Sequence, residues 1–129
     1  MDLNELRNAI MAAGWSASTL ELAEKTGFRC EYCGKDFFGG LDDYYSFEVE
    51  HIIPRGKGED KAENLTVACS TCNFLKRRWD PRSTVGDDAT RDQLISSARQ
   101  YVLERRKVKE DKVEKERNLA RQIIATRGG

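Results

Sequence analysis

The chain has 129 residues and a mass of 14.7 kDa, a size that suits one small domain and excludes a large two-layer enzyme. Lysine and arginine number 22, as do aspartate and glutamate, so a nucleic-acid partner must be held by a local patch rather than by net charge. No apolar run approaches the roughly 18 residues of a membrane span, and the chain starts with acids where a signal peptide carries bases, so we expect a cytoplasmic protein without a membrane partner.

Two short helices are predicted before residue 30. Asp2-x-x-Glu5 is a capping-box pattern, and apolar residues follow it at helical spacing. Ser18-x-x-Glu21 repeats the pattern, and Gly27 is a natural end for the second helix.

A pair of strands is predicted in the middle of the chain, after turn-forming residues at 39–43. Apolar and polar residues alternate before Pro54, which is the period of a half-buried strand with its apolar side chains facing inward. The alternating apolar residues are Tyr45, Phe47 and Val49. Residues 55–64 are polar and rich in glycine, which predicts a loop, and residues 65–67 predict a second strand.

Helices are predicted for the rest of the chain. Ser70 is a candidate N-cap for a helix that runs through Asn73 and Lys76 until Pro81. From Asp87 to about Thr126 the chain is highly charged and free of proline and glycine, which predicts one long helix. Its narrow apolar stripe leaves three roles open, namely packing across the domain, dimerisation and docking on a partner protein.

Four cysteines, Cys30, Cys33, Cys69 and Cys72, form two C-x-x-C pairs separated by 35 residues. In a reducing compartment this spacing favours one zinc site with four thiolate ligands, with disulfides or a redox dithiol as alternatives. Four thiolates leave no open position for water, so such a zinc ion is structural. Drawing the two pairs together folds residues 34–68 into a closed loop.

This closed loop contains the only histidine, His51. It also contains Glu50 and Asn64, and Asn73 follows the second cysteine pair, so an imidazole, an acid and two carboxamides can converge beside a basic helix.

The motifs CEYCG, EVEHIIP, ENL and CSTCNFLK together resemble the HNH nuclease superfamily in its zinc-knuckle-bearing, ββα-metal form. The resemblance runs from Cys30 to about Lys76. It implies an α+β fold, with a small, treble-clef-like HNH core around a four-cysteine zinc site, flanked by N-terminal helices and a long C-terminal helix. We expect an N-terminal helical segment at residues 1–29, the core at 30–82 and a charged helical extension at 83–129.

The resemblance also implies residue roles. His51 corresponds to the general base that activates water, and Asn64 corresponds to the residue that positions it. Glu50 and Asn73 correspond to ligands of a catalytic divalent ion, which makes this an HNN variant. Two hard oxygen ligands favour Mg²⁺ or Mn²⁺. The alternatives are a plain strand acid for Glu50, a turn cap for Asn64 and a first-turn helix residue for Asn73.

One geometric problem follows from the adjacency of Glu50 and His51. Neighbouring residues of a regular strand point to opposite faces, so the family roles require a bulge or a strand that ends there.

The basic residues after the second cysteine pair, Lys76, Arg77, Arg78 and Arg82, are the expected contacts to DNA phosphates, with a solvated helix face as the alternative. Trp79, Tyr44 and Tyr45 can stack on bases, although burial against the knuckles is the favoured expectation for them.

The expected function is metal-dependent hydrolysis of DNA phosphodiester bonds. A zinc-ribbon module that binds nucleic acid or protein without cutting is the alternative from another class. A third hypothesis is a nuclease subunit that depends on a targeting protein, and double-strand cleavage with one site per chain would favour a homodimer.

Overall fold

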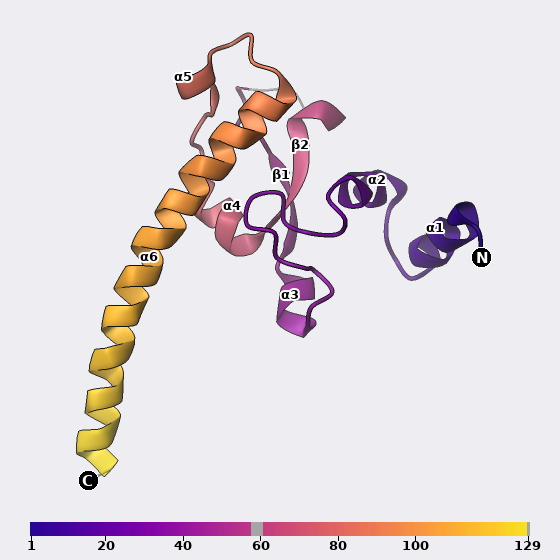
Figure 1. Ribbon diagram of the computed structural model, residues 1–129. Helices are drawn as coiled ribbons and strands as arrows, with labels where there is room; N and C mark the ends of the chain where they lie inside the picture. Colours follow the sequence, from indigo (N-terminus) through magenta and orange to yellow (C-terminus); the bar gives the residue numbers. More distant parts are fainter. Residues whose placement is uncertain (58–60, 129) are drawn as a thin grey trace.

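The computed structural model describes residues 1–57 and 61–128 and has the expected α+β architecture (Figure 1). Its elements in chain order are α1 (Leu3–Ala12), α2 (Ala17–Lys25), α3 (Leu41–Tyr45), β1 (Phe47–His51), the 3-10 turn η1 (Ala62–Asn64), β2 (Leu65–Cys69), α4 (Ser70–Lys76), α5 (Arg82–Val85) and α6 (Arg91–Gly128). The predicted loop at 55–64 lies partly outside the described residues, and its last three residues form η1. Among the described helices, none is both long and apolar enough to cross a membrane.

The two N-terminal helices form largely as predicted. The capping box of α1 is present, because Glu5 N–H donates to the Asp2 side chain at 2.8 Å. The predicted cap of α2 is wrong by two residues. Ser16 caps this helix by accepting from Thr19 N–H at 3.2 Å, which places Ser18 within the first turn.

The sheet consists of β1 and β2, which pair antiparallel with a regular register from Phe47 opposite Cys69 to His51 opposite Leu65. The predicted inward face of β1 is confirmed for Phe47, which packs against the core, but it is wrong for Val49, which is 41% exposed, while Glu50 on the other face is 4% exposed. The reason is that helix α4 covers the glutamate face and supplies polar partners for it.

The region before β1 also differs from the prediction. The chain bends at residues 39 and 40 as expected, but residues 41–43 begin α3, and this helix includes Tyr45, which was expected in the strand. Tyr45 is 76% exposed, so the expectation that it would be buried against the knuckles is wrong.

Helix α4 begins and ends earlier than predicted. Its N-cap is Cys69 rather than Ser70, since the Cys69 sulfur accepts from Cys72 N–H at 3.4 Å. The helix ends at Lys76, and Arg77 follows with a positive φ of 49° that stops helical propagation.

The core lies where the sheet, the cysteine pairs and the first part of α6 meet. Ile95, Ala98 and Val102 of α6 are buried in the same cluster as Tyr32, Phe37 and the buried residues of β2. Tyr101 of α6 also stacks on Trp79, with ring centroids 4.2 Å apart and planes 3° apart. The predicted long helix is therefore present but starts at Arg91, and its first half is part of the domain.

The second half of α6 extends away from the body of the molecule (Figure 1). From Lys107 to Gly128 its residues are exposed, and even Val108 is 67% exposed.

This division of α6 predicts a contrast between two isoleucine truncations. Ile95→Ala removes a side chain that is 5% exposed and should lower the free energy of unfolding by about 2–4 kcal/mol. Ile123→Ala removes one that is 60% exposed and should change it by less than about 0.5 kcal/mol. Urea denaturation of both variants measures the difference, and equal effects would contradict the packing of α6 into the core.

Candidate metal centre and catalytic site

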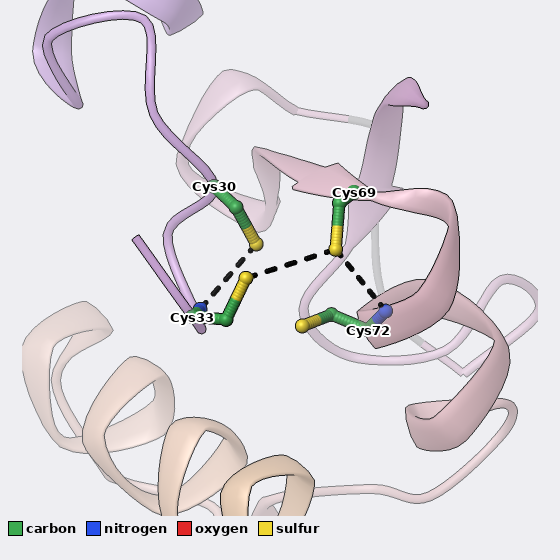
Figure 2. A group of neighbouring side chains, drawn as sticks. All are labelled: Cys30, Cys33, Cys69 and Cys72. Atoms are coloured by element: carbon green, nitrogen blue, oxygen red, sulfur yellow. Dashed lines mark hydrogen bonds between the residues drawn. The ribbon is translucent and has the colours of Figure 1, made fainter. Parts of the chain in front are cut away.

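The four cysteines converge as their spacing predicts, and Figure 2 shows their side chains pointing toward a common centre. Their sulfur atoms all lie within 4.8 Å of one another, and the Sγ atoms of Cys33 and Cys69 are 3.8 Å apart. In each pair the first sulfur accepts from the backbone N–H of the second cysteine, at 3.4 Å. Four sulfur donors at this spacing match the soft, tetrahedral ligand set that zinc prefers.

The mutual hydrogen bonds of the thiols favour ionisation at two of them. The hydrogen bond with Cys30 lowers the pKa of Cys33 to about 6 and holds the pKa of Cys69 far below its ordinary value. Thiolates rather than thiols bind metal. Two lowered pKa values therefore favour binding of a cation, which releases the remaining thiol protons.

Arg106 of α6 contacts the second cysteine pair. Its Nε donates to Cys72 Sγ at 3.1 Å, and its Nη2 donates to Cys69 Sγ at 3.3 Å. The guanidinium therefore supplies both hydrogen bonds and positive charge to two sulfur atoms of the cluster, and it ties α6 to the candidate metal centre. No local pattern in the sequence indicates this contact, since Arg106 lies 34 residues after Cys72 in a helix rich in bases.

Two polar contacts join β1 to α4. Asn73 Nδ2 donates to Glu48 Oε1 at 2.8 Å, and the Lys76 ammonium pairs with Glu50 Oε1 at 2.8 Å. Glu48 and Glu50 share a face because strand side chains alternate, and Asn73 and Lys76 share a face because they are three residues apart in a helix. Glu48 is a site residue that the sequence analysis missed.

Both carboxylate oxygens of Glu50 have a hydrogen-bond or ion-pair partner. The Tyr32 hydroxyl, which comes from the first cysteine pair, donates to Oε2, while Lys76 holds Oε1. Burial raises the pKa of Glu50 above its usual value, and Lys76, Tyr32 and His51 oppose that effect. Burial also raises the pKa of Tyr32, so this hydroxyl remains a donor at neutral pH.

The expected role of Lys76 as a surface contact to DNA is wrong. The residue is 1% exposed, because its ammonium lies between Glu50 and the backbone carbonyl of His51, to which it donates at 3.0 Å.

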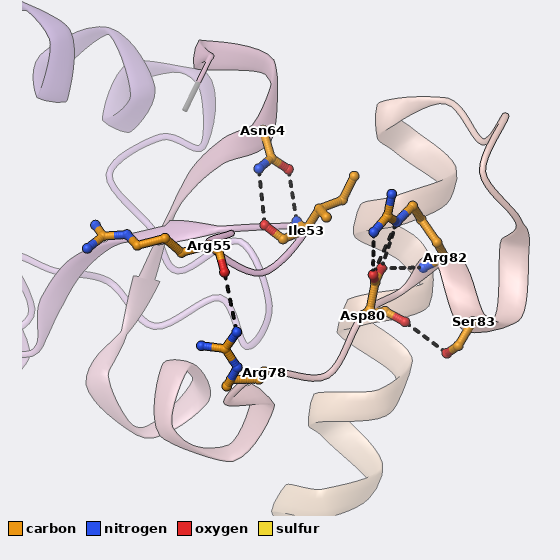
Figure 3. A network of polar contacts seen from close by, with 7 residues as sticks. All are labelled: Ile53, Arg55, Asn64, Arg78, Asp80, Arg82 and Ser83. Atoms are coloured by element: carbon orange, nitrogen blue, oxygen red, sulfur yellow. Dashed lines mark hydrogen bonds and ion pairs between the residues drawn. The ribbon is translucent and has the colours of Figure 1, made fainter. Parts of the chain in front are cut away.

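His51 is the last residue of β1, and the chain on either side of it is fixed. The regular register contains no bulge, so of the two arrangements that the family roles allow the bulge is absent, and His51, paired with Leu65, is where the strand ends. Beyond it, Asn64 Oδ1 accepts from Ile53 N–H at 2.8 Å, and Asn64 Nδ2 donates to the Ile53 carbonyl at 3.1 Å (Figure 3). Ile52 N–H donates to the Asn64 carbonyl at 2.9 Å.

Four exposed bases lie at the end of α4 and in the loop after His51, and we call them the basic rim. They are Arg55, Lys57, Arg77 and Arg78. Arg78 Nη2 donates to the Arg55 carbonyl at 3.4 Å, which links the two segments (Figure 3). Arg82, by contrast, is held by Asp80 at 2.7 Å.

Comparison with known proteins supports the resemblance of the central part of the chain to HNH endonucleases. The family model of the HNH endonuclease matches residues 30–78. This part of the chain is therefore an HNH domain, and its four cysteines fit the zinc-bearing form of that domain. Searches of curated proteins and of solved structures found no match.

The contact between Arg106 and the thiolates predicts slower zinc loss in the native protein than in a variant without it. Arg106→Gln removes the charge and should speed zinc transfer to a chelator about 10-fold. Arg121→Gln removes an exposed charge from the distal part of the same helix and should leave the rate unchanged. A colorimetric chelator assay follows the release, and equal rates for both variants would contradict a role of Arg106 at the metal centre.

Proposed function

We propose that the protein is a divalent-metal-dependent endonuclease that hydrolyses DNA phosphodiester bonds, with His51 as the general base. The observation that carries the proposal is the fixed position of His51. Its own carbonyl accepts from Lys76, and the segment that follows it is held by Asn64. Such fixation is what a general base requires, because proton transfer depends on a defined distance to the attacking water.

The chemistry of imidazole suits this task. Histidine is the side chain whose ordinary pKa lies near neutrality, so it can accept a proton from water at physiological pH. In the proposed reaction the nitrogen of His51 takes the proton as the water oxygen attacks phosphorus. As the bond from that oxygen to phosphorus forms, the bond from phosphorus to the leaving ester oxygen breaks, and this leaving oxygen takes up a proton from solvent water.

The interface between β1 and α4 has a donor set that fits a hard divalent cation. Glu50 contributes carboxylate oxygens and Asn73 a carboxamide oxygen, which are the ligand types that Mg²⁺ and Mn²⁺ prefer. When bound, such an ion stabilises negative charge on the phosphate. Both oxygens of Glu50 already have partners in Lys76 and Tyr32, so binding of an ion by Glu50 requires one of these contacts to open.

Asn64 is proposed to position His51 rather than to react. Its two hydrogen bonds to Ile53 use both ends of the carboxamide, so the side chain acts as a clamp on the backbone beyond the histidine. This geometry unites the two roles considered for Asn64, because the turn that it stabilises is the one that holds the base.

The basic rim is proposed to bind the DNA backbone. Arg77 and Arg78 remain candidates from the sequence, and Arg55 and Lys57 join them because the loop after β1 lies beside the end of α4. Their exposed charges can neutralise phosphates without reading sequence. Arg82 is a weaker candidate, since Asp80 already neutralises it.

Removal of the proposed base should abolish cleavage. His51→Ala should lower the rate of plasmid nicking in Mg²⁺ or Mn²⁺ by about 100-fold or more, because general base catalysis contributes at least that factor. Val49→Ala, an exposed change in the same strand, should cleave like the native protein. Zinc content and thermal unfolding of both variants establish that they are folded.

Each outcome of that assay has a consequence. Comparable cleavage by His51→Ala would overturn the proposed base. A native protein that is zinc-loaded and folded, yet cuts nothing with or without Mg²⁺, would instead favour a binding module or a nuclease subunit that needs a targeting partner.

The basic rim predicts a measurable salt dependence of DNA binding. Arg78→Gln should weaken binding to duplex DNA irrespective of its sequence and reduce the slope of log affinity against log salt by about 0.9, the value for one phosphate contact. Arg121→Gln removes the same charge from distal α6 and should leave the slope unchanged. Fluorescence anisotropy over a salt series provides both values, and an unchanged slope for Arg78→Gln would remove that residue from the DNA contact surface.

A further inference from the structure

The contact between Glu48 and Asn73 has no part in the mechanism described above, although it adjoins the proposed catalytic centre. Asn73 Nδ2 donates to Glu48 Oε1 at 2.8 Å, and both side chains are partly buried between β1 and α4. The neighbouring contact on the same two elements is the pair of Glu50 and Lys76. The two proposed ligands of the divalent ion, Asn73 and Glu50, are thus each held by a contact between β1 and α4.

The chemistry of this contact selects one orientation of the Asn73 carboxamide. An ionised carboxylate only accepts hydrogen bonds, whereas a carboxamide has a donating end and an accepting end. If the amide turned over, its oxygen would face a carboxylate oxygen, and two acceptors would lie together without a proton between them. Glu48 therefore holds the nitrogen of Asn73 toward itself and leaves the oxygen to face elsewhere.

This orientation matters because only the oxygen end of a carboxamide can bind a hard cation. A turned amide would present its N–H groups and repel the ion. We propose that Glu48 is a positioning residue that fixes the Asn73 carboxamide with its oxygen available for the catalytic divalent ion. The inference rests on the proposed function and gives a role to the first residue of the motif EVEHIIP, to which the HNH resemblance assigned none.

A double-mutant cycle between positions 48 and 73 tests the role. In Glu48→Gln the partner of Asn73 can both donate and accept, so the two orientations of the amide become similar in energy. In Asn73→Asp the group at position 73 has two oxygens, and there is no orientation left to select. In the double variant, Gln at position 48 donates to Asp at position 73, so a hydrogen bond is restored with its polarity reversed.

The primary readout is Mn²⁺ binding, measured by electron paramagnetic resonance with no DNA substrate present, and Mg²⁺-dependent nicking of plasmid is the second. Glu48→Gln should weaken Mn²⁺ binding about 10-fold when Asn73 is present, as loss of an outer partner of a metal ligand commonly does. The same substitution should not weaken Mn²⁺ binding when Asp is at position 73, because there it replaces the repulsion between two carboxylates by a hydrogen bond. Glu21→Gln, which removes an exposed glutamate on α2, should leave both readouts unchanged.

Two results would overturn the inference. An equal weakening by Glu48→Gln in both backgrounds would show that Glu48 acts through its charge or as a ligand itself, and no weakening beside Asn73 would show that it has no role. Either result leaves the proposed function intact if the native protein binds Mn²⁺ and cleaves DNA. A native protein that does neither would instead overturn the proposed function. Zinc content and unfolding curves verify the fold of each variant.

Discussion

The convergence of four cysteines on one point fixes how the segments of this small domain are arranged. Cys30 and Cys33 follow α2, whereas Cys69 ends β2 and caps α4, so a metal ion bound by all four cysteines would hold these segments relative to one another. In a chain of 129 residues with a small core, zinc bound at this cluster would contribute folding free energy in addition to apolar burial. Tyr32 lies within the first pair and contacts Glu50, so the metal centre is continuous with the proposed catalytic centre.

The interface between β1 and α4 is polar where most strand–helix interfaces are apolar. Burying a carboxylate and an ammonium costs several kcal/mol each, and their attraction offsets this only with good geometry and further hydrogen bonds. Glu50 and Lys76 meet that condition. The Tyr32 hydroxyl donates to the second oxygen of Glu50, and the Lys76 ammonium also donates to the His51 carbonyl. Replacing a buried ion pair by well-packed hydrophobic residues is often neutral or stabilising, so stability is a weak reason for these residues. The proposed metal-dependent hydrolysis is a stronger one, since it needs oxygen ligands and a fixed histidine at this place.

Helix α6 combines two different environments in one element. Its first half is buried against the core and contacts the cysteine sulfur atoms through Arg106, while residues 107–128 extend away from the domain.

The positive charges of the molecule are unevenly distributed over its surface. The chain is neutral overall, yet the basic rim gathers four exposed bases from the loop after β1 and the end of α4 beside His51. A phosphate backbone can thus be attracted to one side of the molecule without a net positive charge on the whole.

Several elements could be predicted from the amino-acid sequence because their signals are local. The capping box of α1, the C-x-x-C pairs, the strand after them and the length of the last helix follow from residue spacing, since caps, knuckles and periodicity depend on neighbours in the chain. The buried face of β1 and the position of Lys76 inside the domain became clear only from the packing of the elements. The same packing brings Glu48 to Asn73 and Arg106 to Cys72 across 25 and 34 residues. Those contacts depend on how α4 and α6 lie against the sheet, and no local pattern encodes a partner that distant.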